Sequence, residues 1–368
     1  MLKYFCLPFL LLSTLLANDT YFSYSEKELQ RFKGLDSDHI ITKESLIQWD
    51  QRVEEYVAKK PALYSSGHLL RIFTYLYVAQ RDFASLSHQL HGAYKGSIDP
   101  VSLGVIRLFY PFFPLPRGLV IDKYSVVLSE LILGKLKQRF EDEKQVEHFL
   151  SVSQWTFQAS DFGKAILSWV SWRTPSILFK TITVPPPSMQ STDFWEDQLQ
   201  QVRKMSEAMT EEERKNAQFW SYFFEPKGGN WITIINNFLF SSDISLRKIM
   251  NVRALASIAM YDALIVAFES KYTFSIIPPY VADKRIKVLR ELPYPSYPSL
   301  HASISYAAAT VMSFFFPEKQ SKWESIAEEV SHSRVLAGTN YPIDIEMGEE
   351  LGVKVGDYVL SEEGFKKE

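Results

Sequence analysis

Apolar side chains recur every three to four positions along much of this chain, a spacing that places them on one face of an α-helix. Strand-like alternation of polar and apolar residues is scarce. The pattern therefore predicts an all-α protein built as a helical bundle. Seven stretches show the helical spacing or form long runs of helix-forming residues: Ile41–Tyr56, Leu69–Leu90, Val120–Phe140, Ser191–Met209, Thr210–Phe224, Ile244–Lys271 and His301–Phe316.

Polar and proline signals mark where helices begin and where the chain is interrupted. Thr210 followed by Glu213 has the spacing of a capping box, which predicts a helix that begins just after Thr210. Three consecutive prolines at positions 185–187 indicate a linker or domain boundary. We therefore expect an N-terminal helical region over residues 18–190 and a second helical domain over residues 191–368.

Two of the predicted helices share a local pattern. Tyr75–Leu86 and Ala256–Ala267 each contain a small residue, two spacers and then an aspartate, which is Asp82 in the first and Asp262 in the second. The similarity indicates either a repeated helical bundle or two unrelated buried helices with the same Ala-rich spacing. The sequence leaves both interpretations open.

The first 17 residues have the organisation of a secretory signal peptide. Lys3 supplies the positive charge, an apolar run from Tyr4 to Leu16 follows, and Ala17 precedes the expected cleavage point. The alternative is a buried N-terminal helix. If the signal is removed, Cys6, the single cysteine, is removed with it. We therefore expect an exported protein, periplasmic or secreted, without a disulfide or a thiolate metal site.

The remaining sequence limits the possible partners. No later stretch reaches the roughly 20 consecutive apolar residues that a membrane span needs. Ala254–Phe268 contains Asp262 and Ser303–Phe316 is short, so both are interpreted as core helices. The formal net charge of −3 gives no basic surface for nucleic acid. We expect no transmembrane span after the signal peptide and no nucleic-acid partner.

Candidate chemistry is concentrated in the C-terminal half. Ser299 and His301 lie at a predicted loop-to-helix junction, where a hydroxyl, backbone amides and the positive end of a helix can converge on an oxyanion. Asn340 and Asp344 are four residues apart and share a face if that segment is helical. Lys271 ends a largely apolar helix, where its ammonium group can face a pocket.

These residues fall, in order, on three motifs, and the chain resembles the type 2 phosphatidic acid phosphatase (PAP2) / vanadium haloperoxidase superfamily, in particular its soluble, exported bacterial branch. The family pattern is Lys, six residues, Arg-Pro; then Pro-Ser-Gly-His; then Ser-Arg, five residues, His, three residues, Asp. The resemblance covers residues 205–360 well and residues 18–200 only in their helical character. It implies the helical-bundle architecture of these enzymes.

The resemblance also implies a role for each matching residue. An anion-binding set would consist of Lys271, Ser299, the backbone of Leu300, and Arg334. The catalytic positions would be His301, Asp344 and Asn340. Vanadate is a possible cofactor and a phosphate-like anion or phosphoester is the implied ligand, with no metal ligand set in the sequence.

Three positions depart from the family pattern. Pro278 stands where the family has the first-motif arginine, Leu300 stands at the glycine, and Asn340 stands at the nucleophilic or vanadium-ligating histidine. An amide cannot form a phosphohistidine-like intermediate or act as an imidazole ligand. By resemblance the chain is a phosphomonoester hydrolase or a haloperoxidase, and by these residues its activity is weak or absent. The alternative is a non-catalytic pseudoenzyme that binds an anion or a partner.

Two compensating changes are conceivable. The run at positions 284–290 supplies four basic residues after the missing arginine, one of which can reach the site if the run is not simply a solvated charged segment, the interpretation that we favour. His332, two residues before Arg334, is a second possible nucleophile but lies at the wrong spacing. The basic residues of the run are Lys284, Arg285, Lys287 and Arg290.

Three further histidines lie in the N-terminal half, at His68, His88 and His91. His88 and His91 are three residues apart at a predicted helix end. No carboxylate–histidine motif accompanies them, so surface or capping roles are expected rather than a metal site.

Overall fold

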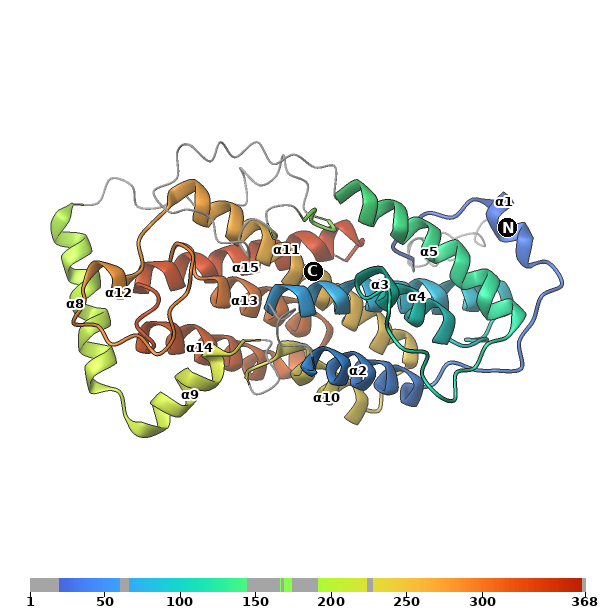
Figure 1. Cartoon of the computed structure of the whole chain (residues 1–368), viewed down its shortest axis with the longest axis horizontal. Coiled ribbons are helices and arrows are strands. Elements are labelled where there is room, and N and C mark those ends of the chain that lie inside the picture. The colour runs from blue at the N-terminus through green and yellow to red at the C-terminus, as the bar shows by residue number, and fades with distance from the viewer. Residues whose placement is uncertain are drawn as a thin grey trace, which may run out of the picture.

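The computed structural model describes residues 20–59, 66–143, 166, 169–173, 191–223 and 228–365. These residues form helices and connecting loops without a β-strand, apart from one isolated antiparallel bridge between Ile40 and Lys95. The all-α prediction is confirmed. The molecule is elongated, with α8 and α9 at one end and α1, α4 and α5 at the other (Figure 1). The helices are α1 (Glu26–Leu29), η1 (Gln30–Phe32), α2 (Lys43–Ala58), α3 (Ser66–His91), α4 (Asp99–Phe109), α5 (Lys123–Glu143), α8 (Thr192–Ala208), α9 (Glu211–Ser221), α10 (Trp231–Ser241), α11 (Leu246–Phe274), α12 (Pro279–Ala282), α13 (Leu300–Phe315), η4 (Pro317–Lys319), α14 (Gln320–Leu336) and α15 (Pro342–Glu362).

All seven predicted helices are present, as α2, α3, α5, α8, α9, α11 and α13. The capping box at the start of α9 is also confirmed, because Thr210 Oγ1 accepts from the Glu213 amide while the Glu213 carboxylate accepts from the Thr210 amide. Helices α1, α4, α10, α12, α14 and α15 were not predicted. Helix α15 begins at Pro342, because the fixed φ and missing N–H of a proline are tolerated at the first helical position.

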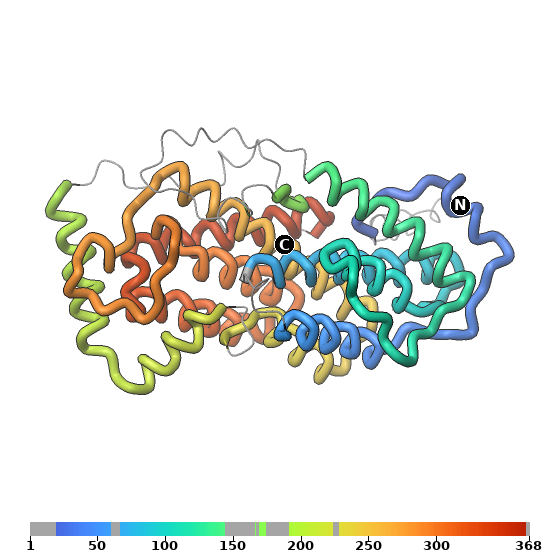
Figure 2. Tube along the Cα trace, viewed as in Figure 1, coloured from blue at the N-terminus to red at the C-terminus, as the bar shows by residue number. Residues whose placement is uncertain are grey.

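Helices from both halves of the chain pack into one continuous apolar core. The long helix α11 lies against α3, α13 and α15, so it connects the N-terminal half with the C-terminal half (Figure 2). The proposed boundary at residue 190 lies outside the described residues, and the division into two domains stays a prediction. The signal peptide at residues 1–17 and the prolines at 185–187 also lie outside them.

Helices α13 and α15 approach each other along three glycines of α15. A Cβ atom at Gly348 would lie 2.6 Å from the Ser299 carbonyl oxygen, and one at Gly352 would lie 2.4 Å from that of Ser303. Real side chains do not tolerate such distances, so only glycine permits this interhelical separation. The close packing fixes the start of α13 against the start of α15, where the motif residues lie.

Each of the two aspartates of the internal similarity accepts hydrogen bonds from two consecutive backbone amides. Asp82 accepts hydrogen bonds from the consecutive backbone amides of Tyr21 and Phe22 at 2.5 and 3.1 Å. Asp262 accepts from those of Trp172 and Arg173 at 2.6 and 2.8 Å. Both carboxylates lie on helices that pack against each other, α3 and α11. This shared geometry favours the repeated-bundle interpretation over chance similarity.

One helical segment of the described chain, Leu246–Ala282, is long and apolar enough to cross a membrane. The expectation that no such segment follows the signal is therefore not confirmed. The apolar window of this segment is 94% buried inside the protein, as in the core helix of a globular fold. Ala254–Phe268 lies within α11 and is part of the core, as predicted.

Candidate functional site

The three sequence motifs come together at the loop of residues 295–299, which leads into α13. Lys271 in the last turn of α11 is 1% exposed. Its Nζ atom donates hydrogen bonds to the carbonyl oxygens of Pro295, Ser296 and Pro298 at 2.9, 2.7 and 2.6 Å. Because three carbonyl groups take its three protons, Lys271 fixes the loop and adds positive charge around it. Its role as a direct anion ligand stays a prediction.

Ser299 and His301 lie where the sequence placed them, at the start of a helix. Ser299 is the N-cap of α13 and its Oγ accepts from the Ala302 amide at 3.4 Å. The Ser299 amide donates to the Asp344 carbonyl oxygen at 2.8 Å, which joins the second motif to the third. The positive end of the α13 dipole therefore points toward the motif residues.

His301 is buried in a positively charged environment. Its ring lies 4.7 Å from that of Phe223 and hydrogen-bonds the backbone of Trp220, whereas its Nε2 atom has no hydrogen-bond partner. Burial lowers the pKa of His301 well below its usual range, so the imidazole is neutral near neutral pH. The pKa is lowered further by three nearby cations, Arg334, Lys271 and Arg290.

Arg334 is 1% exposed and bonds to neutral oxygens. Its Nη2 donates to the Ala217 carbonyl oxygen at 2.8 Å, its Nη1 to Ser221 Oγ at 3.2 Å, and its Nε to Ser333 Oγ at 3.0 Å. Burial lowers the pKa of Arg334 to about 9. A guanidinium taken out of water is costly unless negative charge compensates it, so this position favours a bound anion.

Arg290 separates from the rest of its basic run. Lys284, Arg285 and Lys287 are exposed, as expected for a solvated segment. Arg290 is half-buried, its Nη1 donates to the Ser221 carbonyl oxygen at 2.9 Å, and its guanidinium lies 4.8 Å from the centre of the Tyr222 ring. The solvated-segment interpretation is therefore wrong for Arg290, because the segment after α12 turns it toward the end of α9.

The C-terminal end of α9 thus contacts the three side chains described above, those of His301, Arg334 and Arg290. Arg334 and Arg290 bond to Ser221, and His301 bonds to the backbone of Trp220. The carbonyl end of a helix carries partial negative charge, which suits this contact. This contact of α9 with the motif residues was not predicted, because the amphipathic pattern of Thr210–Phe224 indicates a helix but not its neighbours.

Asn340 and Asp344 are in contact, but not across a helix face. Asn340 lies in the turn before α15, and Asp344 is the third residue of that helix, so Pro342 sets the helix start between them. Asn340 Nδ2 donates to the Ser296 carbonyl oxygen at 2.8 Å and to Asp344 Oδ2 at 3.2 Å. Asp344 Oδ2 also accepts from the Tyr341 amide at 2.8 Å. Both side chains therefore order the turn beneath the loop.

The remaining residues that the sequence singled out are Leu300, Pro278 and His332. Leu300 is 6% exposed and belongs to the apolar core at the first position of α13. Pro278 is buried as the N-cap of α12. His332 is exposed on α14, next to buried Ser331 and Ser333, so it faces away from the motif residues. The structure does not bring His332 to the site as a second nucleophile.

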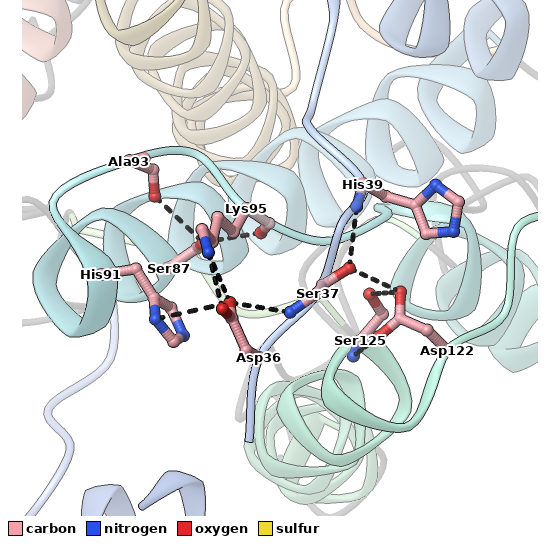
Figure 3. Close-up of polar contacts among 9 residues, drawn as sticks. All are labelled: Asp36, Ser37, His39, Ser87, His91, Ala93, Lys95, Asp122 and Ser125. Atoms are coloured by element: carbon pink, nitrogen blue, oxygen red, sulfur yellow. Dashed lines mark hydrogen bonds and ion pairs between the residues drawn. The ribbon is translucent and has the colours of Figure 1, made fainter. Parts of the chain in front are cut away.

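The three N-terminal histidines contact other residues than the motif residues do. His68 packs against Trp169, and His88 against Tyr94. His91 Nδ1 lies 3.8 Å from Asp36 Oδ1, and the same carboxylate binds Lys95 Nζ at 2.7 Å, in a cluster that ties the segment after η1 to the end of α3 (Figure 3). In the part of the chain that the structure describes, no three histidine, cysteine or acidic residues are grouped to hold a metal ion.

The arrangement can bind and orient an oxyanion. Two guanidinium groups, a lysine ammonium group, an unpartnered imidazole nitrogen and a helix N-terminus lie around one buried region. The residues present do not fit vanadate, which requires an imidazole ligand. Asn340 stands at the position of that ligand, and its amide group donates its hydrogen bonds to Ser296 and Asp344.

Residues 251–359 match the family model of the PAP2 superfamily. A search of curated proteins gave no significant match. Solved structures give the fold. A bacterial vanadium-dependent iodoperoxidase aligns with a TM-score of 0.65 at 18% identity, covering 89% of this chain and 98% of the other. The holo form of a bacterial vanadium-dependent chloroperoxidase aligns with a TM-score of 0.59 at 12% identity, covering 90% and 98%. The predicted architecture and the superfamily resemblance are confirmed.

Proposed function

Residues 251–359 match the PAP2 superfamily, and we propose that this chain is an exported protein that binds an oxyanion. We further propose that it hydrolyses phosphoesters weakly or not at all. One observation carries the binding half of the proposal. The Nε2 atom of His301 is buried without a hydrogen-bond partner among the positive charges of Lys271, Arg290 and Arg334. A buried polar atom without a partner costs free energy, and a bound phosphate would satisfy it, because protonated Nε2 donates to a phosphate oxygen and neutral Nε2 accepts from a P–OH group.

The loss of turnover rests on Asn340. Catalysis in the resembled enzymes needs a nucleophile at this position, and a carboxamide nitrogen has no available lone pair for attack on phosphorus. Its two hydrogen bonds, to Ser296 and Asp344, give this side chain a structural task instead. Bound phosphoester would therefore meet the His301 imidazole and no nucleophile. A phosphate-like anion is the ligand class, and the residues favour neither a phosphatase nor a haloperoxidase.

Calorimetric titration of the purified protein with inorganic phosphate tests the binding half. We expect saturable binding that His301→Gln weakens and that Lys354→Ala, an exposed change on the distant part of α15, leaves unchanged. Hydrolysis of an aryl phosphate is measured on the same preparations. Absence of binding would refute the oxyanion site, and turnover at the roughly 1–1000 per second typical of enzymes, abolished in His301→Gln, would refute the loss of catalysis.

Export rests on the signal-like first 17 residues. Close after that point in the sequence, the amides of Tyr21 and Phe22 bind the Asp82 carboxylate of α3. Mass spectrometry of the protein isolated from its native cells should find a chain that starts at Asn18 in the periplasmic or extracellular fraction. An intact N-terminus in the cytoplasmic fraction would contradict export.

A further inference from the structure

The first-motif arginine of the resembled family is missing here, and its position holds a residue that cannot replace it. Pro278 is the buried N-cap of the short helix α12 and carries no charge. A permanently charged guanidinium that binds two oxygens at once is a strong ligand for phosphate, and a lysine does not substitute for its geometry. The site would therefore lack one of two guanidinium groups if no other arginine entered it.

Arg290 enters the same region from the loop that follows α12. Its Nη1 atom donates to the Ser221 carbonyl oxygen at 2.9 Å, while Arg334 Nη1 donates to the Oγ of the same residue at 3.2 Å. The two guanidinium groups thus bind the same serine, one through its carbonyl oxygen and the other through its hydroxyl oxygen. His301, whose Nε2 lacks a partner, lies close enough for both charges to act on it.

We propose that Arg290 binds the oxyanion as the second guanidinium, in place of the arginine that Pro278 replaces. The inference rests on the proposed function, because it names a ligand for the same anion. Like charges repel, and bringing Arg290 beside buried Arg334 is unfavourable unless an anion lies between or beside them. A tetrahedral oxyanion has enough oxygens for both arginines and for His301.

Neutral oxygens at the end of α9 accept hydrogen bonds from both arginines in this structure. The Ser221 carbonyl and hydroxyl oxygens and the Ala217 carbonyl oxygen receive the guanidinium protons. An incoming phosphate would exchange neutral acceptors for charged ones, and a guanidinium can bind a phosphate through two parallel hydrogen bonds, which adds energy and fixes the geometry. Anion binding would therefore favour breaking the hydrogen bonds between the two arginines and α9.

The test compares two arginines of the same loop by calorimetric titration with inorganic phosphate and with sulfate. Arg285 is the matched control, because its side chain is 71% exposed and its guanidinium binds the Asp283 carboxylate. We expect Arg290→Gln to weaken binding by roughly 10- to 100-fold, the loss of a charged hydrogen-bond donor, and Arg285→Gln to have no effect. Equal affinities for the two variants would overturn the inference.

Two further results keep the test decisive. Arg290→Lys retains the charge and loses the planar fork, so we expect an affinity between wild type and Arg290→Gln; wild-type affinity in Arg290→Lys would contradict bidentate binding, even if Arg290→Gln fails to fold. Phosphate binding by wild type that Arg290→Gln leaves intact refutes Arg290 alone. No binding by wild type refutes the proposed function and this inference together.

Discussion

The side-chain amide of Asn340 donates a hydrogen bond to the carboxylate of Asp344, with Nδ2 and Oδ2 3.2 Å apart. The same Nδ2 atom donates to the Ser296 carbonyl oxygen at 2.8 Å, an oxygen that also accepts from Lys271. Residues from the first and third motifs therefore meet at a carbonyl group of the loop that leads into the second motif. In this chain the position where the resembled enzymes place a reactive histidine has become a link between the loop and α15.

Asn340→Ala should therefore act on stability rather than on chemistry. Removing the amide leaves the buried Asp344 oxygen and the Ser296 carbonyl group with fewer donors, so we expect the free energy of unfolding to fall by about 1–3 kcal/mol. Chemical denaturation measures this change, and hydrolysis of an aryl phosphate is followed in parallel. A loss of hydrolysis without a loss of stability would mean that Asn340 takes part in catalysis.

Oxyanion binding should strengthen as the pH falls. The pKa of His301 is held well below its usual range by burial and by nearby cations, so the free protein has a neutral imidazole. A bound anion favours the imidazolium, and binding then takes up a proton. Sulfate is the suitable probe because its own charge is constant between about pH 8 and pH 5, the range in which histidine acts as a switch.

Other groups of the site titrate in the same direction. Burial raises the pKa of the Asp344 carboxyl group and lowers that of the Lys271 ammonium group, so Asp344 loses negative charge and Lys271 gains positive charge as the pH falls. His301→Ala should therefore make the pH dependence of sulfate affinity shallower without removing it. An affinity that rises with pH would show that the cations around His301 do not receive the anion.

The contact between α13 and α15 should not tolerate a methyl group. Gly352→Ala places a Cβ atom 2.4 Å from the Ser303 carbonyl oxygen, and the helices must separate to admit it. We expect a loss of about 1–3 kcal/mol in the free energy of unfolding, together with weaker phosphate binding. Gly134→Ala on α5 is the control, since open space surrounds that position, and it should stabilise by about 0.5–1 kcal/mol. Similar effects of the two changes would contradict the role assigned to close packing.

The buried ion pair between α2 and α11 should dominate the stability of the N-terminal half. Arg253 Nη2 lies 2.6 and 2.5 Å from the two carboxylate oxygens of Asp50, and both residues are buried. Asp50→Ala leaves a buried guanidinium without its counter-ion, at a cost of about 3–5 kcal/mol. Glu350→Ala breaks an exposed pair with Lys354 and should cost less than about 1 kcal/mol. Denaturation curves of both variants decide the matter, and a comparable loss from Glu350→Ala would contradict the prediction.

Local patterns were sufficient to predict seven helices, because amphipathic spacing and end signals act over a few residues. Whether the segment after Asn340 is helical was left open by the sequence, because a proline can interrupt a helix, whereas Pro342 begins this one. Asn340 and Asp344 were expected to meet on one helix face. They do meet, but through the turn before that helix, since the side chain of Asp344 also accepts from the Tyr341 amide.

By itself the sequence determined the all-α class and the order of the three motifs, and it has Asn340 and Pro278 where the family pattern has a histidine and an arginine. These are properties of residue identity and short-range spacing. Only the tertiary structure decided that Arg290 turns inward, that His332 turns outward, and that the end of α9 contacts the buried arginines. Those outcomes depend on contacts between residues more than 60 positions apart, such as Arg290 with Ser221, which helical spacing along the chain does not encode.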